Sequence, residues 1–477
     1  MAMEFKTGKV IDIIFGVVLI WLSYLAFFKN LGSFSLRTWD ESRIAVNTIE
    51  MFKSGNVLVT TYFDKPDLWN TKPPLLIWLQ VFCIKVFGVS EWSLRIPSAL
   101  SAALTVMLAY FFGAYGLKSK FLGMLASLML LSAMGFSDIH AARTGDYDSL
   151  LTLWMTAGAM TVFLWIKHNN LKWLWLSALF LGVAVLTKSI VGLFFLPGIF
   201  GYIVLYKKNF ILLCKRIENI GPVILWLFLV VGYYIGREMY LPGYLSAVWQ
   251  NDLWGRYLIK QPEVSYPFLY YWNLMRTFRL QYWIYLWPVS IFGLLLPLDK
   301  KFKDYLVYSW FVILVFLVII STSSTKQMWY ELPIYPLVVL TASTLMVAIA
   351  KILPWWLKVI PILPVLFYLQ RGIRTNLAYI NRPDLDKNNI DCQKYGYIFS
   401  EVKRDWSGIV GLSGEDYCAP ATFYFKLNNI QEIKYSDIKA GDTVLVCHRP
   451  TILKIKNKFK NVEEKLILDC VILSLVR

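Results

Sequence analysis

Long apolar runs separated by short polar connectors make up most of this chain of 477 residues. The runs are roughly 17–22 residues long, which is the length that a helix needs to cross the hydrocarbon core of a bilayer. We therefore predict a polytopic, all-α membrane protein with about eleven transmembrane helices. Their expected ranges are 10–28, 93–115, 120–137, 149–166, 172–187, 189–206, 219–240, 281–298, 304–321, 331–350 and 354–370.

The composition supports this class, because 57% of residues are hydrophobic and only 17% are charged. The net charge is +17, but the basic residues gather in every second connector between the predicted spans, so that these connectors fall on one face of the membrane. This distribution follows the positive-inside rule and marks a cytoplasmic face, so it does not indicate nucleic-acid binding. The first run is too long for a signal-peptide core and lacks a small-residue cleavage site, so we expect it to remain as an anchor.

This topology divides the chain into residues 1–370, which form a membrane domain, and residues 371–477, which form a small exoplasmic α/β domain. The exoplasmic loop 29–92 is long enough to hold two interfacial helices, one from Asp40 to Ser54 before Gly55 and one from Leu75 to Val86. In the tail, we read 422–425, 443–446 and 465–476 as β-rich runs.

The tail also holds four cysteines, Cys392, Cys418, Cys447 and Cys470. They allow up to two disulfides, with three connectivities, if this domain is exoplasmic. Free buried thiols are the alternative, and the sequence does not decide between the two.

Charged residues stand beside the membrane in the predicted exoplasmic loops. Asp40 and Glu41 open the first interfacial helix, with Arg43 close behind, and Lys72 precedes two prolines. Asp40 also fits a helix N-cap, and Lys72 also fits a lysine that snorkels to lipid headgroups. The cap reading of Asp40 is compatible with a catalytic role, and charged groups at this depth are costly to place and usually have a function.

Further charges follow in the other loops. The second loop carries Arg143, Asp146 and Asp148, and Asp148 also fits a helix cap with Arg143 as a surface charge. Lys188 interrupts an apolar stretch, where it either snorkels or contacts a phosphate. The later loops add Arg256, Lys326 and Tyr330.

Cations and carboxylates on one face of a membrane protein suggest a substrate with a phosphate and a nucleophilic hydroxyl. Lysine and arginine bind phosphate well, and lipid phosphates lie at this depth. A carboxylate can act as general base on a hydroxyl. No doubly wound nucleotide-binding pattern is visible, so an activated sugar would arrive on a lipid.

Five motifs in order resemble the polytopic GT-C glycosyltransferases of the protein O-mannosyltransferase and lipid A aminoarabinose transferase type. The motifs are Trp39-Asp40-Glu41-Ser42-Arg43, Thr71-Lys72-Pro73-Pro74-Leu75-Leu76, Arg95-Ile96-Pro97-Ser98-Ala99, Ala142-Arg143-Thr144-Gly145-Asp146-Tyr147-Asp148, and Leu186-Thr187-Lys188 followed by Lys326 and Tyr330. The resemblance covers about residues 10–340. Asp148, and not Asp146, matches the main acidic position of the second loop.

The resemblance implies an inverting transfer of a sugar from a polyprenyl-phosphate donor to a lipid A, glycan or protein acceptor at the exoplasmic face. Asp40 and Asp148 would be the catalytic carboxylates, with Asp40 as the base and Asp148 ordering the site. The remaining roles also follow from the resemblance: Lys72, Arg256 and Lys188 would bind the donor phosphate, and Glu41, Arg43, Arg143, Lys326 and Tyr330 would line the substrate cavity.

Some relatives hold a metal with a glutamate before the lysine and a histidine in the third loop. Here Thr71 precedes Lys72, and none of His140, His168 and His448 looks well placed, so we expect no metal and no cofactor. We expect a bacterial inner membrane, with the site and the tail in the periplasm. The alternative function is a transporter or flippase for a lipid-linked glycan, although the two related halves typical of transporters are not visible.

Overall fold

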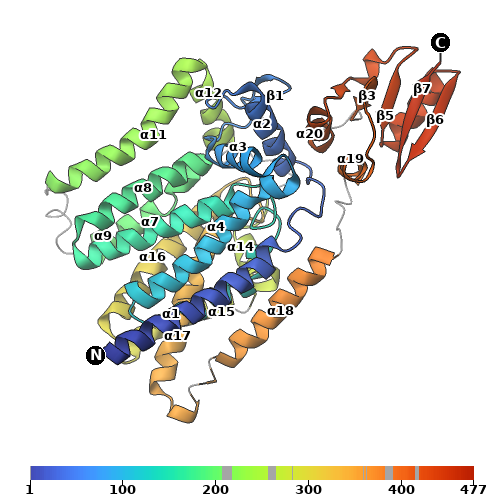
Figure 1. Cartoon of the computed structure of the whole chain (residues 1–477). Coiled ribbons are helices and arrows are strands. Elements are labelled where there is room, and N and C mark those ends of the chain that lie inside the picture. The colour runs from blue at the N-terminus through green and yellow to red at the C-terminus, as the bar shows by residue number, and fades with distance from the viewer. Residues whose placement is uncertain are drawn as a thin grey trace.

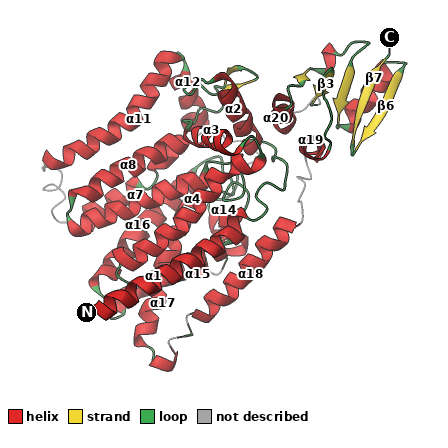
Figure 2. Ribbon diagram, in the orientation of Figure 1, coloured by secondary structure: helices red, strands yellow, loops and turns green. Residues whose placement is uncertain are grey.

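The computed structural model describes residues 2–206, 217–255, 265–281, 283–357, 359–360, 362–381, 390–413 and 418–476. Within them, a bundle of long helices carries a smaller domain with a sheet at its C-terminal end (Figures 1 and 2). The polytopic helical fold and the small terminal α/β domain are therefore confirmed.

Eight helical segments in the described part of the chain are long and apolar enough to cross a membrane. They are Lys9–Phe28, Glu91–Gly116, Asp148–His168, Leu171–Leu193, Ile217–Tyr240, Lys300–Thr322, Leu332–Ile352 and Trp355–Thr375. Shorter apolar helices occupy the other three predicted positions, at Lys120–Ser132, Leu196–Leu205 and Trp283–Leu295. The count of eleven spans stays a prediction.

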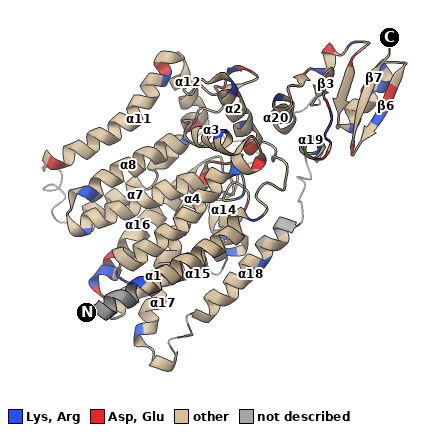
Figure 3. Cartoon of the chain, viewed as in Figure 1, with Lys and Arg blue, Asp and Glu red and all other residues tan. Residues whose placement is uncertain are grey.

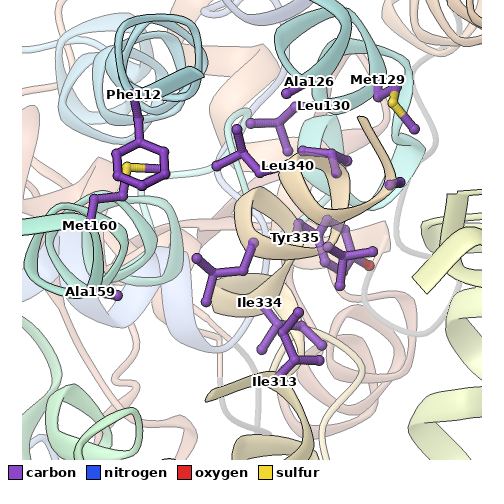
Figure 4. Packing of buried hydrophobic residues seen from close by; sticks show 14 of the residues in the cluster. Phe112, Ala126, Met129, Leu130, Ala159, Met160, Ile313, Ile334, Tyr335 and Leu340 are labelled. Carbon is purple, nitrogen blue, oxygen red and sulfur yellow. The ribbon is translucent and has the colours of Figure 1, made fainter. Parts of the chain in front are cut away.

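Helix α17 (Tyr335–Ile352) is the most buried of these helices, and it packs against α5 (Lys120–Ser132), α15 (Trp283–Val289) and α16 (Lys300–Thr322). Beside it, α7 (Asp148–His168) packs against α4 (Glu91–Phe111) and α8 (Leu171–Lys188). Aliphatic and aromatic side chains interlock between these helices (Figure 4). The remaining bundle helices are α1 (Ala2–Ser23), α9 (Leu196–Tyr206), α11 (Ile220–Tyr240) and α18 (Ile362–Asn381).

Contacts between connectors show which of them share an end of the bundle. At one end, Lys120 pairs with Asp12 at 2.7 Å, and the Lys167 Nζ donates to the Gly116 carbonyl at 3.2 Å. Charged side chains gather at helix ends and on the C-terminal domain, and the middles of the long helices are largely free of them (Figure 3). These basic connectors therefore lie together, as the sequence predicted, at the end opposite the interfacial loop.

The interfacial loop forms the two predicted helices, α2 (Asp40–Ser54) and α3 (Leu75–Phe87). Gly55 ends α2 with a positive φ of 72°, a backbone conformation that costs glycine little. Between the helices, β1 (Thr61–Tyr62) and β2 (Lys65–Pro66) form a short antiparallel pair.

The C-terminal domain contains a five-stranded mixed sheet in the order β4-β3-β5-β7-β6. Its strands are β3 (Ile409–Leu412), β4 (Gln431–Glu432), β5 (Thr443–Val446), β6 (Val462–Ile467) and β7 (Cys470–Leu475), and its helices are α19 (Ile390–Glu401), α20 (Ala419–Leu427) and α21 (Arg449–Lys458). The β reading of 422–425 is wrong, because these residues lie in α20 and are buried on all sides. The run 465–476 falls across two paired strands and not one.

Two disulfides, Cys392–Cys418 and Cys447–Cys470, select one of the three connectivities. The domain contacts the interfacial loop through α20, whose Tyr424 hydroxyl accepts a hydrogen bond from the Leu36 N–H at 3.0 Å and donates to Glu91 at 2.7 Å. In Figure 1, α20 is the element of this domain nearest to α2.

Candidate active site

The two acids at the start of α2 have different surroundings. The preceding residue, Trp39, is the N-cap and has a positive φ of 70°, and Asp40 is the first residue of the helix. Asp40 is therefore not an N-cap, and its side chain is 40% exposed. The neighbouring Glu41 is buried.

Glu41 and Arg95 form a closed ion pair beneath the loop. The Arg95 Nε donates to Glu41 at 2.6 Å and its Nη2 at 3.0 Å, and the N–H groups of Arg37 and Gly145 also donate to this carboxylate. Arg95 directs its other N–H groups to carbonyls of residues 31, 34 and 35. Burial opposes ionisation, but the Arg95 charge and these hydrogen bonds hold the pKa of Glu41 below its usual value.

The Asp40 side chain meets residues of the second loop. The Nδ1 atom of His140 lies 3.8 Å from the Asp40 Oδ2 and 3.4 Å from the Asp146 Oδ1. The imidazole stacks on the Trp329 ring, with centroids 3.4 Å apart and planes 9° apart. The prediction that no histidine is well placed is therefore wrong for His140, and these three side chains are grouped closely enough to hold a metal ion.

Asp146 is an unusual member of this group. It is 2% exposed, and neither of its carboxylate oxygens accepts a hydrogen bond from any residue that the structure describes. Burial, together with the nearby carboxylates of Asp40 and Glu41, raises the pKa of Asp146 to about 6, against the opposing effect of His140. A buried carboxylate without hydrogen bonds is costly, so Asp146 is a candidate functional residue.

Lys72 approaches the same loop from the other side. Its ammonium lies 5.6 Å from the centre of the Tyr147 ring, and Tyr147 stands between the two acids of the second loop. The preceding residues are fixed, because the Asn70 side chain donates to Tyr147 at 3.1 Å and the Thr71 carbonyl accepts from Tyr244 at 2.7 Å. Lys72 is thus brought next to the second loop.

Asp148 and Lys188 form a buried pair at 2.5 Å, with the Lys188 ammonium 5.4 Å from the centre of the Tyr330 ring. Asp148 starts α7, but Tyr147 holds the cap position, so Asp148 does not serve as the cap. A largely apolar cavity opens beside the pair and is lined by Asp148, Leu151, Lys188, Ile190, Val191, Phe194, Asp252, Ile320, Ser323 and Tyr330. The structure therefore brings together three of the predicted site residues.

Two predicted cavity residues, Arg43 and Arg143, bind parts of the external loops. Arg43 forms a bidentate pair with Asp67, at 3.0 and 2.7 Å, between the rings of Tyr62 and Trp69. Arg143 donates to the carbonyls of residues 26, 27, 29 and 30 at the end of the first span. Both arginines stabilise the loops that carry the site.

Of the two remaining predicted site residues, Lys326 and Arg256, the structure describes only Lys326. Lys326 is buried and donates to the Ser323 carbonyl at 2.7 Å, which places it near the cavity wall. Arg256 lies outside the described residues.

The sequence did not single out Arg95, His140 or Asp146 as members of the site. Arg95 carried a usable signal, because an arginine one turn into an apolar helix needs a partner. His140 carried no such signal in the sequence, because its place in the site depends on a contact with Asp40, a hundred residues earlier.

Comparisons with known proteins show which families and folds the chain resembles. Residues 71–234 match the family model of dolichyl-phosphate-mannose-protein mannosyltransferases. An uncharacterised protein of Aquifex aeolicus is 28% identical over 67% of the chain and 62% of its own length. An undecaprenyl phosphate-alpha-4-amino-4-deoxy-L-arabinose arabinosyl transferase of Proteus mirabilis is 28% identical over 41% of the chain and 35% of its own length.

The fold is that of ArnT from Cupriavidus metallidurans, whose crystal structure with undecaprenyl phosphate superimposes with a TM-score of 0.71 at 16% identity and covers 99% of both chains. The resemblance to GT-C glycosyltransferases is thereby confirmed at the level of the fold and of the named relatives. The chain spans less than two thirds of the length of the relatives matched by sequence.

Proposed function

We propose that this protein is an integral-membrane, inverting glycosyltransferase that moves a sugar from a polyprenyl-phosphate donor to a lipid A, glycan or protein acceptor. One observation carries the proposal. A single loop, residues 140–148, links the carboxylates of Asp40 and Asp146 to the cavity that holds Lys188. The likeness to proteins named for mannosyl and aminoarabinosyl transfer supports the same reaction.

In this reaction the acceptor hydroxyl oxygen attacks the anomeric carbon of the sugar. The bond from that carbon to the phosphate oxygen breaks, and its electron pair leaves with the polyprenyl phosphate. Asp40 takes the hydroxyl proton, a role that suits a carboxylate open to incoming substrate. Inversion follows from a single displacement at the anomeric carbon.

The cations act on the leaving phosphate. Asp148 fixes the Lys188 ammonium at the cavity wall, and an ammonium has three N–H donors, so it can bind a phosphate while it remains paired. Lys72, beside Tyr147, contributes a second positive charge, and we propose Arg256 as a third from the sequence alone. The apolar part of the cavity suits a polyprenyl chain.

We place the protein in a bacterial inner membrane with the site facing the periplasm. The basic connectors at the opposite end of the bundle support this orientation. The two disulfides of the C-terminal domain also support it, since disulfides persist in oxidising compartments.

Mass spectrometry of envelope glycolipids and glycoproteins tests the function in cells that carry the wild type, Asp40→Asn or the control Asp64→Asn, which alters an exposed acid. We expect Asp40→Asn to lose one sugar from one acceptor and to accumulate the polyprenyl-phosphate donor. Loss of a whole glycan would indicate transport, and an unchanged profile would remove Asp40 from the mechanism.

A further inference from the structure

Two tyrosine side chains meet at the junction of α11 and α12. Tyr234 lies in α11, and Tyr244 begins the short helix α12 (Tyr244–Val248), which lies beside the end of α11 (Figure 1). The turn between them contains Gly243, whose φ of 95° costs glycine little, and the Glu238 side chain accepts a hydrogen bond from its N–H at 2.9 Å. The two tyrosine rings stack, with centroids 6.0 Å apart and planes 20° apart.

Tyr244 holds the backbone on one side of Lys72. Its hydroxyl donates to the Thr71 carbonyl at 2.7 Å, and both residues are buried. On the other side of Lys72, the ring of Pro73 restricts the backbone. The segment from which the Lys72 side chain extends is therefore fixed on both sides, and its ammonium lies 5.6 Å from the centre of the Tyr147 ring.

Tyr234 holds the residue that follows Lys188. Its hydroxyl donates to the Ser189 Oγ at 2.9 Å. Ser189 has a φ of 54°, a backbone conformation that residues other than glycine seldom adopt. Residues in such conformations persist only where their surroundings hold them, and they are common at ligand sites. The Tyr234 hydrogen bond therefore stabilises the turn directly after Lys188, the residue that pairs with Asp148 at the cavity wall.

Arg237 connects this tyrosine pair to the first external loop. Its guanidinium lies 5.0 Å from the centre of the Tyr244 ring, and it donates to the Leu58 carbonyl and, at 3.3 Å, to the Thr60 hydroxyl. Arg237 is itself buried. The end of α11, the start of α12 and the first external loop are therefore packed together, and the two tyrosine hydroxyls extend from this unit.

We propose that Tyr234 and Tyr244 are positioning residues that hold Lys188 and Lys72 in place for one lipid phosphate, and the proposal rests on the transferase function given above. An ammonium that binds phosphate lies about 2.7–2.9 Å from an oxygen, so two lysines can share one phosphate only at a defined spacing. Lysine side chains are flexible, and fixing the backbone beside each of them reduces the entropy lost on binding. Each tyrosine acts through its lysine and not on the substrate.

Binding of undecaprenyl phosphate to the purified full-length protein tests the proposal. The variants are Tyr234→Phe, Tyr244→Phe, Lys72→Ala and Lys188→Ala, made singly and in tyrosine–lysine pairs, and isothermal titration calorimetry in detergent gives Kd. Phenylalanine keeps the ring and removes only the hydroxyl. Each tyrosine variant should bind about two- to tenfold more weakly, which is the effect of losing one hydrogen bond.

The paired variants separate positioning from general stability. Tyr244→Phe should have no further effect on Kd once Lys72 is alanine, whereas Tyr234→Phe should keep its effect there. Lys188→Ala should give the reverse pattern. If Lys188→Ala does not fold, the pairs with Lys72→Ala decide the outcome.

Tyr240→Phe is the matched control, because Tyr240 is an exposed tyrosine at the end of the same helix and should bind undecaprenyl phosphate like the wild type. Unfolding temperatures provide a second readout. A tyrosine that only stabilises the fold would lower the unfolding temperature and weaken binding equally in both lysine backgrounds, and that result would overturn the positioning role.

Failure of the positioning role and failure of the function are distinguishable. A wild type that binds undecaprenyl phosphate with a Kd that neither tyrosine variant changes overturns the positioning role and leaves the transferase standing. The expected coupling, in a protein that consumes no polyprenyl-phosphate sugar, supports the positioning role and overturns the transferase. A wild type that binds no undecaprenyl phosphate overturns both.

Discussion

Asp40 and Glu41 are adjacent in the sequence, yet they belong to two regions of opposite character. Glu41 lies in a closed region where Arg95 and two backbone N–H groups satisfy both of its oxygens. Asp40 lies in an open region beside His140 and Asp146, where hydrogen bonds to the Asp146 carboxylate are absent from the described residues. The satisfied ion pair stabilises the loop, whereas a buried carboxylate without hydrogen bonds is a candidate for binding a ligand or taking part in a reaction.

Breaking the closed region should give the largest effect on stability. Arg95→Ala leaves the buried Glu41 charge without its partner, and such a change typically costs about 3–5 kcal/mol. Thermal unfolding in detergent measures the loss. The control Lys120→Ala removes a partly exposed pair with Asp12 and should cost about 1 kcal/mol or less. Equal stability of the two variants would contradict the structural role of Arg95.

Removing the cavity cation should give the next effect, on donor binding. Lys188→Ala removes a charged hydrogen-bond donor worth about 1.5–3 kcal/mol, so KM for the donor should rise roughly ten- to a hundredfold. The purified protein with a synthetic polyprenyl-phosphate sugar provides the measurement. Lys351→Ala, on the basic end of the bundle, should leave KM unchanged. A change in kcat alone would place Lys188 outside the phosphate site.

Lowering the pH in metal-free buffer should change the contributions of the two regions to the stability of the fold in opposite directions. The folded-state pKa of Glu41 lies below its usual value, so its stabilisation is present above pH 4.5 and is lost as the pH falls through the folded pKa. The pKa of Asp146 is raised to about 6, so between pH 3.8 and about 6 stability falls as the pH rises. Each pKa unit is worth about 1.4 kcal/mol.

Unfolding temperatures of the wild type, Glu41→Gln and Asp146→Asn across pH 4–7 measure this contrast. Asp146→Asn should remove the loss of stability between pH 4 and 6, and Glu41→Gln should leave it in place. The same pH dependence in both variants would mean that the two carboxylates do not differ in environment.

The sequence predicted the periodic parts of this protein well. The apolar runs predicted the eight long spans, and Gly55 and Pro74 predicted the ends of the interfacial helices, because both signals are local. It failed for residues 422–425, where four buried residues in a row have no helical or strand periodicity to read.

The site was predicted only in part, for a physical reason. Charge and position at the membrane edge identified Asp40, Lys72, Asp148 and Lys188. These two properties do not distinguish a basic side chain that binds substrate from one that stabilises a loop. Arg143 donates to backbone carbonyls more than a hundred residues earlier. Such partners depend on how distant loops meet, and that information is not present in spacing along the chain.

The most direct test of the central claim compares Asp40→Asn with Glu41→Gln in one preparation, by transfer rate and unfolding temperature. Removing a general base typically costs 10²–10⁴-fold, so we expect Asp40→Asn to lose about this much rate at an unchanged unfolding temperature. Glu41→Gln should lower the unfolding temperature. Full transfer by Asp40→Asn would contradict the account.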